Sequence, residues 1–189
     1  MLSSGELRKL ICTAFDDAVY PGDQCLRGSD EGEEPYLLEN EFRGKRNWRA
    51  LEPAFIDQAP DGFGSALSFF SNEAFRFYVP AYLIADIDGV LERQSPVFHL
   101  TRGVDEQSRG VQINPRRYGN RTWLEHAKSK FALFSNKEST AIVEYLRHCC
   151  EVEVSDQSPN VWRTRNATFW ERKSIRQALE YYWLARANG

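Results

Sequence analysis

Four arginines gather in one segment of the sequence that is rich in glycine, proline and asparagine. The four are Arg102, Arg109, Arg116 and Arg117, and a fifth arginine, Arg121, ends the segment of residues 102–121. A guanidinium group carries a rigid fork of N–H donors that matches a carboxylate or a phosphate. The segment therefore predicts an anion-binding loop or, in the alternative, a loop whose arginines pair with acidic residues of the same chain.

An acidic segment lies near the start of the chain. Residues 16–41 hold nine Asp and Glu residues against one basic residue, Arg27. The order of the acids lacks the regular spacing of a calcium loop. We expect an exposed acidic surface that captures a basic protein partner, with a merely solvated loop as the alternative. The residues expected to form this surface are Asp23, Asp30, Glu31, Glu33 and Glu34.

Histidine and cysteine show no catalytic or metal-binding spacing. The three histidines, His99, His126 and His148, stand in no HxH, HxxxH or HExxH arrangement, and no CxxC or GxSxG motif occurs. His148 is followed by Cys149 and Cys150, but neighbouring helical residues point about 100° apart and do not converge on a metal. We expect no metal, no cofactor and no catalytic residue.

Capping patterns and apolar spacing predict the helices of the first part of the chain. Ser3 and Glu6 have capping-box spacing ahead of an apolar face, so a helix is expected over residues 3–19. Shorter helices are expected over residues 35–42 and 53–58.

The stretch FFSNEAFRFYVPAYLIADIDG, residues 69–89, is the most apolar in the chain. Ser71 is the expected N-cap, and the apolar residues run nearly all round the helix, which predicts a buried central element. Pro80 has no amide hydrogen and crowds the preceding turn. We expect a bend at Pro80 or two helices that meet there.

An expected N-cap and a capping box predict the starts of two helices in the second part of the chain. Thr122 or Asn120 is expected to cap a helix that ends near Phe131, and Ser135 with Glu138 begins an amphipathic helix.

The same part of the chain holds two short β-like runs and a last helix. Val97–Leu100 and Val111–Ile113 are the runs that would pair as a small ribbon. The last helix is expected over residues 174–187, with Ser174 as its cap.

The composition is that of a globular protein. Of the 189 residues, 42% are hydrophobic and 27% charged, which favours one domain over residues 1–189. We expect a mainly α, compact bundle of about five to six helices, with at most a small β-ribbon near residues 97–113. The two terminal helices are expected to pack on a core of about residues 40–150.

Charge and hydropathy exclude several classes of protein. The net charge of −3 disfavours nucleic-acid binding. No apolar run reaches the roughly 20 residues that a membrane span needs, and the start of the chain lacks a signal-peptide pattern. We expect a cytoplasmic protein with reduced cysteines that binds neither nucleic acid nor a membrane.

Several blocks resemble a family of small bacterial proteins that is classed as a domain of unknown function. The blocks are LSFFSNEAFRFYVPAYLIADI, PVFHLTRG, INPRRYGNRTW and STAIVEYLRH, in this order, with ALEYYWLA near the end. The resemblance covers about residues 40–150. It implies a bacterial origin, and it carries no activity and no site residue with it.

Three functions fit these observations. The first is a non-enzymatic protein-binding protein, most concretely a bacterial immunity protein that neutralises a cognate toxin through the acidic surface. The second is a small enzyme or anion sensor that uses the arginine segment, with Asp86 or His99 as an acid–base group. The third is a scaffold or assembly subunit, which an exposed patch of Trp162, Phe169 and Trp170 would favour.

Overall fold

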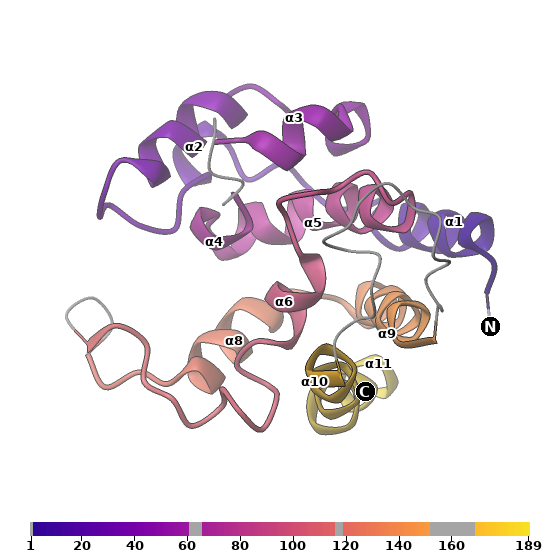
Figure 1. Cartoon of the computed structure of the whole chain (residues 1–189). Helices are drawn as coiled ribbons and strands as arrows, with labels where there is room; N and C mark the ends of the chain where they lie inside the picture. Colours follow the sequence, from indigo (N-terminus) through magenta and orange to yellow (C-terminus); the bar gives the residue numbers. More distant parts are fainter. Residues whose placement is uncertain (1, 61–65, 116–118, 152–168) are drawn as a thin grey trace. The chain divides into compact units, whose positions relative to one another are not determined.

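The computed structural model describes residues 2–60, 66–115, 119–151 and 169–189 (Figure 1). Its described part is helical, with isolated β-bridges and no sheet, which confirms the predicted mainly α class. The chain divides into two compact units. The N-terminal unit is Ser4–Pro96, and the C-terminal unit is Val97–Gly189 together with Leu2 and Ser3.

The N-terminal unit holds five α-helices and two short 3₁₀ turns in its described residues. These are α1 (Ser4–Ala14), η1 (Asp23–Cys25), α2 (Glu34–Phe42), η2 (Trp48–Ala50), α3 (Pro53–Gln58), α4 (Ala66–Phe69) and α5 (Asn72–Ile87). Helix α5 is the central element, since α1, η2 and α3 all contact it. The expected helices over residues 35–42 and 53–58 are present as α2 and α3.

Helix α5 begins where the sequence predicts. The Ser71 hydroxyl accepts a hydrogen bond from the Ala74 amide at 3.0 Å, which satisfies a free N–H at the helix start. Most of the helix is buried, including Pro80 itself. The helix is continuous through Pro80, so the alternative of two helices meeting there is wrong, while the expected bend stays a prediction.

An aromatic cluster fills the core of the N-terminal unit beside α5. The Phe42 ring lies 4.8 to 5.0 Å, between ring centroids, from Phe55, Phe70 and Tyr78. Edge-to-face pairs at these distances add to the free energy gained from burying the rings. The rings come from α2, α3, α5 and the end of α4, so the cluster joins helices that lie apart in the sequence.

Helix α1 is shorter than expected and ends at Ala14 instead of residue 19. Asp16 and Asp17 follow directly, and carboxylates are unfavourable at the negative end of a helix dipole. The apolar pattern continues to Val19, but Val19 is exposed and packs on no core.

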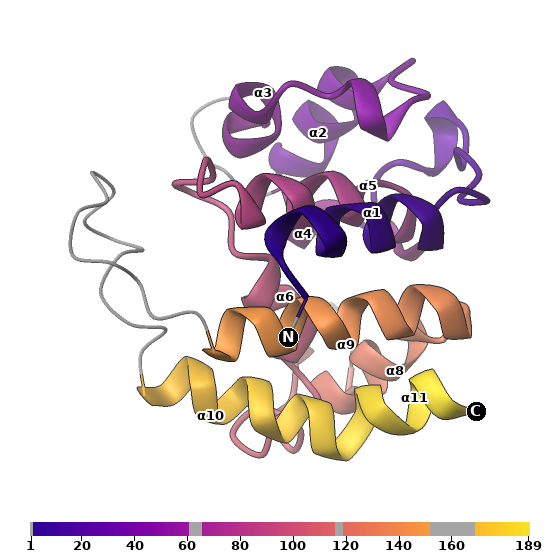
Figure 2. The same ribbon diagram turned by 90° about the vertical axis from the view of Figure 1, so that its right-hand side faces the viewer.

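The C-terminal unit holds α6 (Pro96–Thr101), α8 (Trp123–Phe131), α9 (Asn136–Glu151), α10 (Phe169–Ala178), a π-helical segment η3 (Leu179–Trp183) and α11 (Leu184–Asn188). Helix α9 and the continuous α10–η3–α11 helix lie side by side and run in opposite directions (Figure 2). The described residues thus contain more helices than the five to six expected, because short runs such as α4 and α6 form helices of their own.

Among the side chains that the structure describes, Trp183 is the largest that is fully buried, and it organises the core of the C-terminal unit. Its ring centroid lies 4.7 Å from that of Phe131 and 5.9 Å from that of Phe134. Its indole Nε1 donates a hydrogen bond to the Leu100 carbonyl at 2.8 Å. A single side chain thereby connects the C-terminal helix to α6 and to the end of α8.

The predicted β-ribbon is wrong in one of its two strands. Val97–Leu100 is helical as part of α6, because Pro96 suits the first turn of a helix and four apolar residues carry too little periodicity to distinguish the two states. The other run, Val111–Ile113, forms a single antiparallel bridge between Gln112 and Thr122.

Caps confirm the starts of α8 and α9 but not of the last helix. Thr122 and Glu125 form a complete capping box, and the Ser135 and Glu138 side chains and amides exchange hydrogen bonds in the same way. Ser174 lies inside the last helix, which begins at Phe169 instead of residue 174. The Glu, Arg and Lys residues that precede Ser174 are good helix formers, and they extend the helix towards its N-terminus.

Gly103 allows α6 to approach α8 closely. Its φ of +92° is in the left-handed region, and a Cβ at this position would lie 2.4 Å from the Trp123 carbonyl oxygen. Glycine is therefore the residue that fits both the backbone conformation and the space.

Candidate functional site

Arg27, the single base of the acidic segment, organises the surface around it. Its Nε donates to Glu39 on α2 at 2.5 Å, and its other nitrogens contact Asp30 and the Ser29 carbonyl. Its guanidinium carbon lies 4.3 Å from the centroid of the Tyr36 ring. Sequence reasoning missed this role, although the isolation of one arginine among nine acids was the available signal.

The acids of the loop before α2 point mostly to solvent. Asp30, Glu31 and Glu33 are exposed, with 80% of the Asp30 side chain accessible, and Glu34 is half-buried. Gly32 turns the chain with a φ of +80°. Glu33 and Glu34 occupy the N-terminus of α2, where a negative charge is favourable, so they also stabilise the helix that presents them.

Two large apolar side chains lie exposed on α2, directly after these acids. Tyr36 is 44% and Leu37 39% exposed, while Pro35 and Leu38 beside them are buried. We call Asp30, Glu31, Glu33 and Glu34 together with Tyr36 and Leu37 the acidic surface. It combines negative charge with two apolar anchors, the composition of many protein-recognition surfaces.

Asp23 is bound within its own unit. Its Oδ1 accepts from the Tyr20 hydroxyl at 2.5 Å and from the Gly44 amide at 2.7 Å. These two hydrogen bonds lower the pKa of Asp23, and burial together with Asp23 raises the pKa of Tyr20 to about 12. Asp23 therefore fastens the loop after α1 to the end of α2, apart from the acidic surface.

Two described arginines of the 102–121 segment, Arg102 and Arg109, lie over aromatic rings. Arg102 lies 4.9 Å from the Trp123 ring centroid, and its Nε is buried without a hydrogen-bond partner among the described residues. Arg109 lies 5.5 Å from the Tyr181 ring centroid, on a different helix. The two guanidinium groups thus support helix packing at two separate places.

Arg116 and Arg117 lie outside the described residues. Asn114 and Arg121, on either side of them, are described, and Arg121 donates to the Glu125 carbonyl at 3.5 Å. The arginine segment as an anion site therefore stays a prediction.

A pair of basic side chains, the buried Lys130 and the half-buried His99, lies in the C-terminal unit and was missed by sequence reasoning. Burial lowers the pKa of Lys130, on α8, to about 8. Burial and, to a smaller extent, Lys130 lower the pKa of His99, on α6, to about 3. No sequence signal marks this lysine, because the burial of a side chain depends on the tertiary packing around it. Asp86, the other predicted acid–base candidate, lies in α5 of the N-terminal unit.

The four cysteines form no disulfide in the described structure. All four are free thiols, and burial raises the pKa of Cys149 to about 12, so it is protonated at neutral pH. No group of three or more His, Cys, Asp or Glu residues among those described is arranged to hold a metal ion.

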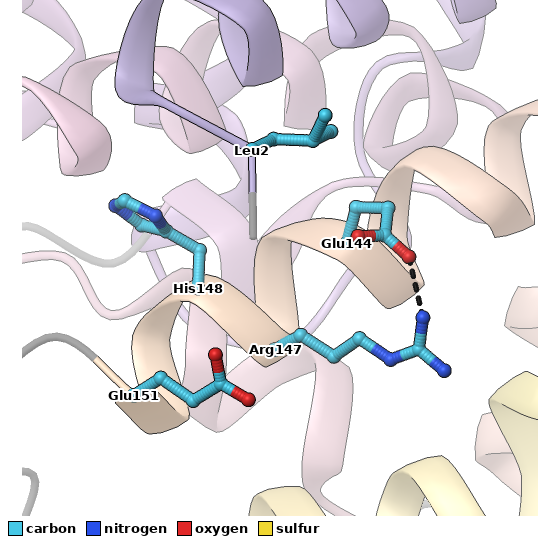
Figure 3. Close-up of a pocket in the computed structure, with 5 residues that line it drawn as sticks. All are labelled: Leu2, Glu144, Arg147, His148 and Glu151. Atoms are coloured by element: carbon cyan, nitrogen blue, oxygen red, sulfur yellow. Dashed lines mark hydrogen bonds and ion pairs between the residues drawn. The ribbon is translucent and has the colours of Figure 1, made fainter.

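A small pocket lies along the last two turns of α9 (Figure 3). It has a volume of about 270 Å³ and is lined by Leu2, Glu144, Arg147, His148 and Glu151. An ion pair of 2.6 Å joins Arg147 to Glu144, as Figure 3 shows. We call this the α9 pocket. Sequence reasoning missed it because Leu2 is remote in the sequence from the other four residues.

A family model described as a family of unknown function, DUF6714, matches residues 3–187. The chain belongs to the DUF6714 family. This confirms the predicted membership of an uncharacterised family, and the match extends well beyond the expected residues 40–150. No curated protein and no solved structure matches the chain.

Two further observations concern the DUF6714 chain as a whole. No helix in its described ranges is both long and apolar enough to cross a bilayer. The aromatic patch that would favour a scaffold, formed by Trp162, Phe169 and Trp170, has all its side chains outside the described part.

Proposed function

We propose that this DUF6714 chain is a non-enzymatic protein-binding protein that captures a basic partner through the acidic surface. Most concretely, we propose a bacterial immunity protein that acts in the cytoplasm and neutralises a cognate toxin. The observation that carries the proposal is the exposure of Tyr36 and Leu37 beside Asp30, Glu31 and Glu33.

The order of the acidic surface favours binding. Arg27 holds Asp30 and Glu39 and lies over the Tyr36 ring, so loop and helix present a fixed arrangement. A surface that is ordered before binding loses less conformational entropy when the partner docks. The acids attract a basic partner from a distance, and the apolar anchors hold it once in contact.

Candidate partners are the toxin-like proteins encoded beside the gene. Each is purified and mixed with the chain, and binding is measured by calorimetry at low and at high salt. We expect one of them to bind tightly, to lose its toxic activity in the complex, and to bind more weakly at high salt. The absence of a complex with every neighbouring candidate contradicts the proposal.

Charge reversal tests the acids of the surface. We expect the triple variant Asp30→Lys, Glu31→Lys, Glu33→Lys to reduce the association rate at least tenfold, since it replaces attraction by repulsion. The matched control is Glu52→Lys with Glu92→Lys, two exposed acids of the same unit. An equal loss in both variants would indicate a general charge effect and no specific surface.

Alanine substitution tests the anchors. We expect Tyr36→Ala and Leu37→Ala to raise the dissociation rate of the complex. The association rate should stay within about threefold of the wild-type value, because apolar contacts form after the first encounter. Tyr181→Ala removes an equally exposed tyrosine from the C-terminal unit and serves as the control. If Tyr181→Ala alone weakens the complex, the partner binds elsewhere.

A further inference from the structure

The α9 pocket combines acidic, basic, aromatic and apolar side chains within one helix and one remote residue. Glu144, His148 and Glu151 have the spacing i, i+4 and i+7, which places them on one face of α9. Leu2 supplies an apolar wall opposite this face (Figure 3). A volume of about 270 Å³ lies just below the usual range of pockets for drug-sized molecules, so the ligand is a small one.

The charges of the pocket favour a cation. Arg147 and Glu144 neutralise each other across 2.6 Å, which leaves the exposed Glu151 carboxylate in excess. Burial lowers the pKa of His148, while Glu151 acts in the opposite sense, and the net shift is downward. At neutral pH the imidazole is therefore mainly uncharged, and the pocket carries a net negative charge.

The hydrogen-bonding groups favour a donor. The His148 Nδ1 atom has no accessible surface and no partner among the described residues, so Nε2 is the ring nitrogen that a ligand can reach. A neutral imidazole accepts through its unprotonated nitrogen, and a carboxylate only accepts. An ammonium group has three N–H donors and no acceptor, which matches this set.

We propose that the α9 pocket binds a small primary amine as its ammonium ion. The Glu151 carboxylate and His148 Nε2 accept its N–H groups, and its carbon chain lies against Leu2. This activity is separate from the proposed function, because it uses the C-terminal unit and no residue of the acidic surface.

The test is a titration of the full chain with n-butylammonium chloride at pH 7, followed by the amide signals in two-dimensional NMR. We expect saturable, roughly millimolar binding that shifts the amides of Arg147, His148 and Glu151. n-Butanol has the same carbon chain without charge and n-butyrate has the opposite charge, so neither is expected to produce these shifts.

Two variants assign the contacts. Glu151→Gln is expected to weaken n-butylammonium binding at least tenfold without loss of folding, since Glu151 is exposed and its charge is unfavourable at a helix C-terminus. Leu2→Ala is expected to reduce the preference for n-butylammonium over methylammonium several-fold, because the longer chain loses its apolar contact. Glu180→Gln, an exposed acid on the neighbouring helix, is the control.

Each contrary result overturns the proposal. These results are no saturable shift with n-butylammonium, equal shifts with n-butanol or n-butyrate, or unchanged affinity in Glu151→Gln. None of them depends on a protein partner, so the outcome is independent of whether the acidic surface binds a toxin.

Discussion

The basic side chain of Lys130 is buried and that of His99 is half-buried in the C-terminal unit. Burial in a medium of low polarity disfavours the charged form of a base and lowers its pKa. In the folded chain Lys130 has a pKa of about 8, compared with about 10.4 for an exposed lysine. The pair therefore makes the stability of this unit depend on pH.

Lys130→Met is expected to raise the free energy of unfolding at pH 7 by about 2 kcal/mol, because it removes the cost of a buried ammonium. Between pH 8 and 10.4 the unfolded chain holds a proton that the folded chain has released, so wild-type stability rises with pH. The variant should lose this rise. Urea unfolding at pH 7 and pH 9.5, followed by tryptophan fluorescence, measures both effects.

The control for this experiment is Lys128→Met on the same helix, where the side chain is exposed. It should keep the wild-type rise in stability above pH 8. If both lysine variants behave alike, Lys130 is solvated in the folded protein.

His99→Leu is expected to reduce the acid sensitivity of the chain. With a folded pKa of about 3 and an unfolded pKa of about 6.5, the wild-type free energy of unfolding falls as the pH falls from 6.5 towards 3. At pH 4 the difference amounts to about 3 kcal/mol. Thermal unfolding of the wild type, His99→Leu and the half-buried control His126→Leu at pH 7 and pH 4 checks this. If His99→Leu loses as much stability between pH 7 and pH 4 as the wild type does, His99 does not cause the acid sensitivity.

Three of the residues that cap helices could be predicted from the sequence, because a cap depends only on neighbours within four positions. Ser71, Thr122 and Ser135 all cap where the sequence indicates. The burial of Lys130 was not predictable, since it depends on tertiary packing and no local pattern distinguishes Lys130 from the exposed Lys128. Arg27 could be recognised as unusual, but its contacts with Tyr36 and Glu39 require the folded loop.

At the scale of the elements, the capping box of α8 offers a direct test. Thr122→Ala is expected to lower the free energy of unfolding by about 1 kcal/mol, because the Glu125 amide loses its acceptor and the Glu125 carboxylate loses a donor. Chemical denaturation measures the change. Ser129→Ala, on the exposed face of the same helix, should change stability by less than about 0.5 kcal/mol.

Element boundaries were less predictable than element types. Apolar periodicity extended the first helix to residue 19, but the acids at 16 and 17 end it earlier. For the last helix, the Ser174–Gln177 spacing imitated a cap inside a longer helix. In both cases the local pattern was real, and the competing effects were helix-end electrostatics and the strong helix propensity of the preceding residues.

At the scale of the whole molecule, each unit buries an aromatic cluster of its own. Phe42, Phe70 and Tyr78 pack within the N-terminal unit, and Phe131, Phe134 and Trp183 within the C-terminal unit. The two clusters share no ring. This division was not predicted from the sequence, because the glycine- and arginine-rich segment that begins near it was interpreted as a loop within one domain.

A fragment of residues 4–96 is therefore expected to fold without the rest of the chain. It should show helical circular dichroism and a cooperative thermal transition, since the rings of its aromatic cluster all come from within the fragment. The matched control is Phe42→Ala in the same fragment, which should destabilise it by about 3 to 5 kcal/mol. A fragment that is unfolded at low temperature would show that the unit depends on the remaining residues.

The indole of Trp183 has a consequence for how the chain is made. Synthesis on the ribosome proceeds in the N-terminal to C-terminal direction, so Phe131, Phe134 and the Leu100 carbonyl emerge before the Trp183 side chain that packs on them. The core of the C-terminal unit therefore cannot form completely until Trp183 has left the ribosomal exit tunnel. The N-terminal unit, in contrast, can fold during translation.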